Sequence, residues 1–176
     1  MGAARLKLRR GMQAPNANGV RQIAKALGIG LVSPEDVVRA RPDLLYVLGP
    51  SFRQMDPVVD GLEGIRCVVV QDFKPSLLTD RAHIVMPGAS YAQKDGTYTN
   101  GEGRVQRLRR VVQTRGDARD DLSILSDIVY GITGKRIGSF DQVLGTLVKE
   151  VPSFVGIDVD GLTGDVRLRK AAGRLW

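Results

Sequence analysis

The spacing of apolar residues divides the first half of the chain into alternating helices and strands. Apolar residues at helical spacing predict one helix that is capped at Asn16 or Asn18 and a second that starts at Ser33. Three continuous apolar runs are typical of strands buried on both faces: Leu44–Leu48, Cys67–Val70 and Ile84–Met86. Short helices are expected between these strands, over residues 56–62 and 76–81. This order predicts an α/β fold with a doubly wound, mainly parallel sheet.

After Pro87 the pattern of buried strands and short helices stops. The polar, glycine-rich segment 88–103 contains a short strand, and residues 104–112 alternate between apolar and basic side chains. We therefore expect a short β-ribbon added to the parallel sheet. Two amphipathic C-terminal helices should follow, the first capped by Asp117 and the second by Ser139.

Helical and strand periodicity ends near residue 155. We expect an α/β domain over residues 1–154, as a fragment of a larger subunit, and a basic extension over 155–176. The basic start MGAARLKLRR lacks the apolar region of a secretory signal. We interpret it as a lead-in from an internal site of a longer protein, a basic organellar presequence being the alternative. No window approaches the roughly 18 to 20 apolar residues of a membrane span.

The chain has one cysteine and one histidine, which limits the metal chemistry expected of it. Iron-sulfur clusters are typically held by four thiolates, so the chain cannot hold one by itself. The usual His/Cys zinc site also lacks ligands. We expect Cys67 to pack as a small apolar side chain in its strand and His83 to have a structural role. We expect no catalytic residue and no metal ligand in this chain.

A net charge of +7 is the one unusual bulk property, and it favours an anionic partner. The predicted partner interface is the basic side of the ribbon: Arg104, Arg107, Arg109 and Arg110. These arginines have three interpretations: a solvated face, a subunit interface and a nucleic-acid surface. Nucleic acid is the least supported, because aromatic residues make up only 5% of the chain and no nucleic-acid-binding motif is present.

The stretch from Val68 to Arg110 is the most specific part of the sequence. Many of its residues fall in step with one family pattern without a gap: Gln71-Asp72, Ala82, Pro87, Lys94-Asp95-Gly96-Thr97, Asn100, Glu102-Gly103-Arg104 and Gln106. It resembles the molybdopterin-oxidoreductase fold family, in the version used by the C-terminal part of the large iron-sulfur subunit of the respiratory NADH-quinone oxidoreductase, complex I. Weaker similarity at Asn16–Gly19 and Ser139–Leu162 extends the resemblance through nearly the whole chain.

The resemblance also indicates what this chain lacks. Catalytic members of the family bind a pterin guanine-dinucleotide cofactor between several domains, and ligands of parallel sheets lie at the carboxyl ends of the strands. Here Ser76-Leu77-Leu78 replaces the family's Thr-Glu-Thr, and 49–52 replaces its polar Gly-Glu-Asn-Pro. Rim groups that could pair with a nucleotide are thereby lost. Asp72 and Ser76 remain the candidate rim contacts, although Asp72 has the alternative role of capping the following helix.

The resemblance implies a non-catalytic structural module in the peripheral arm of a respiratory NADH-quinone oxidoreductase. Its partners would be other subunits, or the rest of its own subunit, on the cytoplasmic side of a bacterial inner membrane or in the mitochondrial matrix. The parent assembly would carry iron-sulfur clusters and FMN, and this chain no cofactor. The alternative is a cofactor-contacting fragment of a molybdopterin enzyme such as a formate dehydrogenase. A basic α/β binding module is the third hypothesis.

Overall fold

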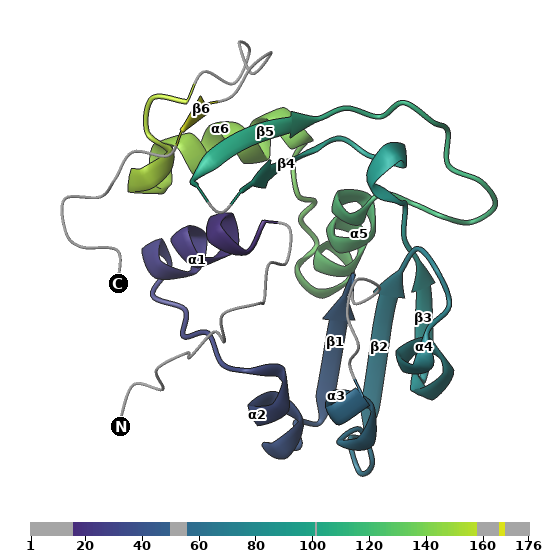
Figure 1. Cartoon of the computed structure of the whole chain (residues 1–176). Helices are drawn as coiled ribbons and strands as arrows, with labels where there is room; N and C mark the ends of the chain where they lie inside the picture. The colour runs from purple at the N-terminus through teal and green to yellow at the C-terminus, as the bar shows by residue number, and fades with distance from the viewer. Residues whose placement is uncertain (1–15, 50–55, 101, 158–165, 168–176) are drawn as a thin grey trace.

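The computed structural model describes residues 16–49, 56–100, 102–157 and 166–167. Most of the predicted lead-in, residues 50–55 and most of the predicted C-terminal extension lie outside these residues. Three parallel strands form the first sheet, in the order β1 (Leu44–Leu48), β2 (Cys67–Asp72) and β3 (Ile84–Pro87) (Figure 1). The predicted α/β class and parallel sheet are confirmed, and β1 has the bounds expected from its apolar run.

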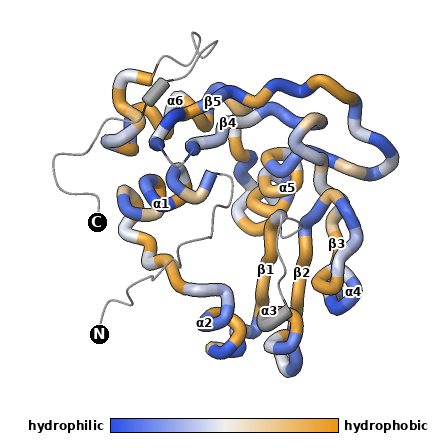
Figure 2. The backbone as a smooth tube through the Cα atoms, viewed as in Figure 1, coloured by the Kyte–Doolittle hydropathy of each residue, from blue (hydrophilic) through white to orange (hydrophobic). Residues whose placement is uncertain are grey.

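Three short helices cover one face of the parallel sheet: α2 (Pro34–Arg39), α3 (Asp56–Asp60) and α4 (Leu77–Arg81). Their apolar residues pack on the alternate strand residues Val68 and Val70, which makes the first core. Figure 2 shows this sheet as a band of hydrophobic strands with hydrophilic turns at its ends. The predicted start at Ser33 is confirmed, since its hydroxyl accepts a hydrogen bond from the amide of Asp36.

The opposite face of the sheet differs from the sequence prediction. Only β2 is buried along almost its whole length, whereas Leu44, Leu48 and Ile84 are exposed. Cys67, expected in the core, is only half-buried. The physical reason is that α2, α3 and α4 all lie on the other face and that β1 and β3 are edge strands. Even Val85, which shares the helix-covered face with Val70, is 49% exposed.

A second sheet is antiparallel, in the order β4 (Gly96–Thr99), β5 (Arg104–Leu108) and β6 (Val166–Arg167). The predicted β-ribbon is therefore confirmed. Val105 of β5 lies in a second core with apolar residues of α6 (Phe140–Glu150) and of the 3₁₀ turn η3 (Pro152–Phe154). Ser139 caps α6 as predicted.

The helix α1 (Ala17–Ala26) lies against β4 (Figure 1). The sequence predicted that Asn16 or Asn18 caps this helix. Asn16 precedes α1, but its side chain makes no capping hydrogen bond. Instead its Oδ1 accepts a 2.9 Å hydrogen bond from the amide of Thr99. Gly19 permits this close approach, because a Cβ there would lie 2.8 Å from the hydroxyl oxygen of Thr99.

The helix α5 (Asp121–Thr133) lies between the two sheets (Figure 1). Its cap is Asp120 and not Asp117, because the Asp120 carboxylate accepts a 2.9 Å hydrogen bond from the amide of Ser123. The residues just before α5 pair with the end of β3, where the amide of Arg119 donates to the carbonyl of Pro87 and the amide of Ala89 to the carbonyl of Arg119. A short 3₁₀ turn, η2 (Tyr91–Gln93), follows β3.

Candidate functional site

The carboxyl edge of the parallel sheet is the candidate functional site, because ligands of such sheets bind there. Gln71, near the end of β2, is 1% exposed and points to the face opposite α2, α3 and α4. The hydroxyl of Tyr46 donates a hydrogen bond to its Oε1, and its Nε2 donates to the Oδ1 of Asp121 at 2.7 Å. Lys94 completes the group through an ion pair with the other carboxylate oxygen of Asp121.

We call Tyr46, Gln71, Lys94 and Asp121 the edge network. It draws its members from β1, β2, the segment before β4, and the first turn of α5. Partial burial raises the pKa of Tyr46, and the nearby charge of Asp121 raises it further. The phenol therefore stays protonated near neutral pH and remains a donor to Gln71.

Asp72, the first rim candidate, lies at the end of β2 and is 6% exposed. Its Oδ1 accepts a 2.7 Å hydrogen bond from the amide of Phe73, whereas its Oδ2 is buried and has no hydrogen-bond partner. The alternative role of Asp72 as a helix cap is wrong, because Ser76 occupies the cap position of α4. Asp72 thus keeps one acceptor atom that the described residues do not use.

Ser76, the second rim candidate, is engaged in a capping box with Thr79. The Ser76 hydroxyl accepts a hydrogen bond from the Thr79 amide at 3.3 Å, and the Ser76 amide donates to the Thr79 hydroxyl at 2.7 Å. The sequence singled out this residue for its position, and the structure places its hydroxyl in the start of α4. Asn100 forms a turn network, since its Oδ1 accepts hydrogen bonds from the amides of Glu102 and Arg104.

The four ribbon arginines do not share one solvated face. Arg107 is 15% exposed, lies 3.2 Å from the carboxylate of Asp141 and stacks 4.4 Å above the ring of Phe140. The expectation that it points to solvent is wrong, because it shares the strand side of Val105, which faces α6. The partner interface stays a prediction. Arg104 lies near Glu102 and Arg110 near Asp120, at 3.8 and 4.0 Å, whereas Arg109 is exposed.

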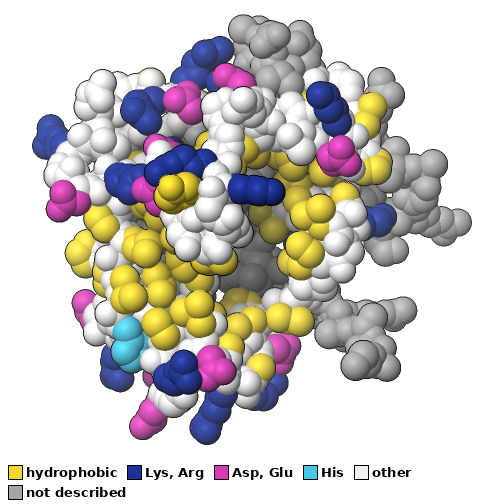
Figure 3. Space-filling view, turned by 180° about the vertical axis from the view of Figure 1, so that it is seen from behind, with side chains coloured by type: hydrophobic (Ala, Val, Ile, Leu, Met, Phe, Trp, Pro, Cys, Tyr) yellow, Lys and Arg dark blue, Asp and Glu magenta, His cyan; other side chains and the backbone are white. Residues whose placement is uncertain are grey.

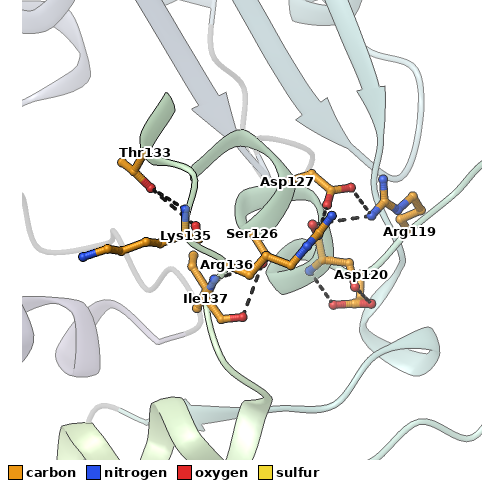
Figure 4. A network of polar contacts seen from close by, with 9 residues as sticks. Arg119, Asp120, Ser126, Asp127, Thr133, Lys135, Arg136 and Ile137 are labelled. Carbon is orange, nitrogen blue, oxygen red and sulfur yellow. Dashed lines mark hydrogen bonds and ion pairs between the residues drawn. The ribbon is translucent and has the colours of Figure 1, made fainter. Parts of the chain in front are cut away.

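A second polar cluster was not predicted. Asp127 on α5 accepts hydrogen bonds from Arg119 and Arg136, which hold its pKa below the ordinary value (Figure 4). A surface cavity of about 260 Å³ adjoins the three side chains. The guanidinium of Arg136 also lies 4.6 Å from the ring centre of Tyr130. No sequence spacing links Arg119 to Arg136, and the turn after α5 brings them together.

The described residues contain no cluster of three or more His, Cys, Asp or Glu side chains placed to hold a metal. His83 is exposed, and its Nδ1 accepts a 3.0 Å hydrogen bond from the amide of Val68, which agrees with a structural role. Among the described helices, none is long and apolar enough to cross a membrane.

Comparison with known proteins identifies a family. The molybdopterin oxidoreductase family profile matches residues 5–130. The chain is 34% identical over 134 residues to the NADPH-Fe(3+) oxidoreductase subunit alpha of Geobacter sulfurreducens, covering 73% of this chain and 16% of that protein. It is 31% identical over 143 residues to the F420-dependent formate dehydrogenase 2 subunit alpha of Methanococcus maripaludis. This match covers 76% of this chain and 21% of that protein.

A third relative is a subunit of the NADH-quinone oxidoreductase of Rhizobium meliloti, with 31% identity over 141 residues, 76% of this chain and 16% of that protein. The chain therefore spans about a fifth or less of the length of these three relatives. Because the relatives carry three different activities in their names, their similarity does not select one of them.

Proposed function

This chain belongs to the molybdopterin oxidoreductase family, and we propose that it is a structural module of a larger oxidoreductase assembly, without an active site of its own. The observation that carries the proposal is the edge network. At the sheet edge where family members would present ligand-binding groups, Gln71 and Lys94 are each bonded to Asp121. Their role is to join the parallel sheet to α5.

A ligand at this edge would have to compete with these internal bonds. Gln71 is almost fully buried, so separating it from Tyr46 and Asp121 leaves buried polar groups without partners. Each such group costs about 1–3 kcal/mol. The hydroxyl of Ser76 is likewise committed to the cap of α4. The edge network therefore favours a rigid scaffold over a binding rim.

The assembly that fits this role is a respiratory NADH-quinone oxidoreductase, in whose peripheral arm the chain would pack around the electron path. The similarity to a subunit of such an enzyme supports this choice. Iron-sulfur clusters and FMN would then belong to other parts of the assembly, on the cytoplasmic side of a bacterial inner membrane or in the mitochondrial matrix. We also propose the division into an α/β domain over 1–154 and a basic extension over 155–176.

Native purification of the assembly through a tag on this chain tests the proposed partners. We expect subunits with iron-sulfur and flavin-binding sequences to co-purify in fixed stoichiometry, as identified by mass spectrometry. Recovery of the chain alone, under conditions that keep other respiratory complexes intact, would refute the proposed role.

A second candidate function is contact with a guanine dinucleotide, and the unpaired Oδ2 of Asp72 favours it. A guanine base presents an amino group that can donate a hydrogen bond to a carboxylate. A pterin dinucleotide would supply the redox chemistry in such an assembly, and Asp72 would hold only its guanine end. Gln71 and Ser76 form other hydrogen bonds. Asp72 is therefore the one residue of the described edge that fits the dinucleotide, and the edge does not form a complete binding site.

Titration of the chain with guanosine diphosphate separates the two candidates. Contact through Asp72 predicts saturable binding that Asp72→Asn abolishes. The structural role predicts no saturable heat or chemical-shift change in either protein. Glu102→Gln is the matched control, because Glu102 is an exposed carboxylate beyond the end of β4.

A further inference from the structure

The parallel sheet has one apolar face that no described helix covers along its length. Strand alternation places on this face the residues that point away from α2, α3 and α4, and we call them the open face: Leu44, Tyr46, Leu48, Cys67, Val69, Gln71, Ile84 and Met86. Leu44 is 58% exposed, Leu48 49% and Ile84 47%, whereas Val69 and Gln71 in the central strand are 6% and 1% exposed, so the exposed part of the open face lies on β1 and β3. Seen from behind, hydrophobic side chains gather over this part of the molecule, beside the single histidine (Figure 3).

Such a face is unusual for this kind of sheet. Parallel sheets occur almost only with both faces covered, because their crossover helices lie on them. At the amino-terminal end of the strands the open face is bordered by exposed charged and polar residues, Asp43, Arg66 and His83. At the carboxyl end the ion pair of Lys94 and Asp121 borders it. An apolar centre with a polar rim is the arrangement of a protein interface.

We propose that the open face is the docking site of an amphipathic α-helix supplied from outside this 176-residue chain. The proposal rests on the proposed function, in which the chain is one module of a larger assembly. Relatives provide the source of such a helix, since the matched region is only 16–21% of their length. The rim of the open face carries both signs of charge, Arg66 beside Asp43 and Lys94 beside Asp121, so the polar side of that helix needs no single charge.

The dimensions of the open face fit one helix. Neighbouring strands lie about 4.8 Å apart, so the axes of β1 and β3 are about 10 Å apart, close to the diameter of one helix. The strands are four to six residues long, so the face is roughly 17 Å long, which corresponds to about three helical turns. Leu44, Leu48 and Ile84 would enclose the apolar stripe of that helix.

Cys67 provides a direct test, because it is the only cysteine and lies on the open face in register with Leu44. We would measure the rate at which a bulky maleimide labels Cys67 in the isolated chain and in the natively purified assembly. We expect labelling to slow at least tenfold in the assembly. Equal rates in the two samples would overturn the proposal.

A matched control uses Ile132→Cys in a Cys67→Ala background, because Ile132 is exposed on α5 and lies off the open face. We expect this thiol to be labelled equally fast in both samples. Slowing at both positions would mean general shielding and would overturn docking at this face. A crosslinker at Cys67 then identifies the occupant by mass spectrometry. A segment with apolar residues at helical spacing supports the proposal, and a second copy of this chain contradicts it.

Substitution supplies an independent measurement. Leu44→Lys with Ile84→Lys should release the chain from the assembly while leaving its melting temperature unchanged, whereas Ile132→Lys should be retained. A lowered melting temperature would mean that these side chains belong to this chain's own core, which would refute the docking role. Protection of Cys67 in an assembly without respiratory subunits would refute the proposed function and leave the docking proposal standing.

Discussion

Gln71 and Asp121 lie fifty residues apart in the sequence, yet the Nε2 of Gln71 donates a 2.7 Å hydrogen bond to the Oδ1 of Asp121. The bond joins the central strand β2 to the first turn of α5. Lys94 binds the second oxygen of the same carboxylate, so three segments meet at the edge where a ligand would otherwise bind. This relationship is the basis for a structural function.

The edge network should contribute measurably to stability. Gln71→Ala leaves Tyr46 and Asp121 without their buried partner, so we expect the free energy of unfolding to fall by about 1–3 kcal/mol. Urea unfolding followed by circular dichroism measures this loss. Gln106→Ala on β5 is the control, because Gln106 is exposed and should change stability by less than about 0.5 kcal/mol. A loss for Gln71→Ala no larger than that of the control would contradict a structural network.

Arg107 and Arg109 should respond differently to charge reversal. Arg107→Glu removes the contacts with Asp141 and Phe140 and places two carboxylates together, so we expect a loss of about 1–3 kcal/mol. Arg109→Glu changes an exposed side chain and should stay within about 0.5 kcal/mol. Thermal melting of the two single variants decides the matter. Equal melting temperatures would show that Arg107 is a solvated residue.

Asp127 should make stability depend on pH in acid. Hydrogen bonds from Arg119 and Arg136 lower the pKa of Asp127 below the ordinary 3.8. Because the folded-state pKa is the lower one, the contribution is present above 3.8 and is lost as the pH falls through the folded-state pKa. Asp127→Asn should therefore lower the melting temperature near neutrality, and the difference from the native chain should shrink below pH 3.8. A difference that grows in acid would contradict the ion-pair role.

Asp72 should tolerate the loss of its charge in the isolated chain, because one of its carboxylate oxygens has no hydrogen-bond partner among the described residues. Asp72→Asn retains an oxygen that can accept from the amide of Phe73 and removes a buried charge, so we expect stability to be unchanged or raised by about 1 kcal/mol. Chemical denaturation of the isolated chain provides the measurement. A marked loss of stability would mean that the carboxylate has a structural partner.

The strands were predictable because continuous apolar runs have few alternatives in a chain with clear turn residues. The run Leu44–Leu48 became β1 without a change of bounds, and Ser33 and Ser139 capped the expected helices. Asp117 and Asp120 offer the same carboxylate, and only the folded position of Ser123 selects Asp120. The sequence could therefore locate α5 but not its cap.

Side-chain partners were not predictable, because they depend on which elements meet. Arg107 belongs to a run of basic residues, and only the packing of β5 on α6 reveals Asp141 and Phe140 as its neighbours. The Asp127 cluster depends in the same way on the turn after α5 (Figure 4). The open face was also missed, since a continuous apolar run indicates two covered faces without saying which residues cover them.

The most direct test of a structural function is the cofactor content of the natively purified assembly. Molybdenum or tungsten is measured by elemental analysis, the pterin dinucleotide by mass spectrometry after release, and both are compared with the amount of this chain. If the chain is a structural module of a respiratory NADH-quinone oxidoreductase, the assembly contains iron and flavin. Molybdenum, tungsten and the pterin dinucleotide are then absent in stoichiometric amount. One pterin dinucleotide and one molybdenum or tungsten per chain would contradict that function and support the dinucleotide contact at Asp72.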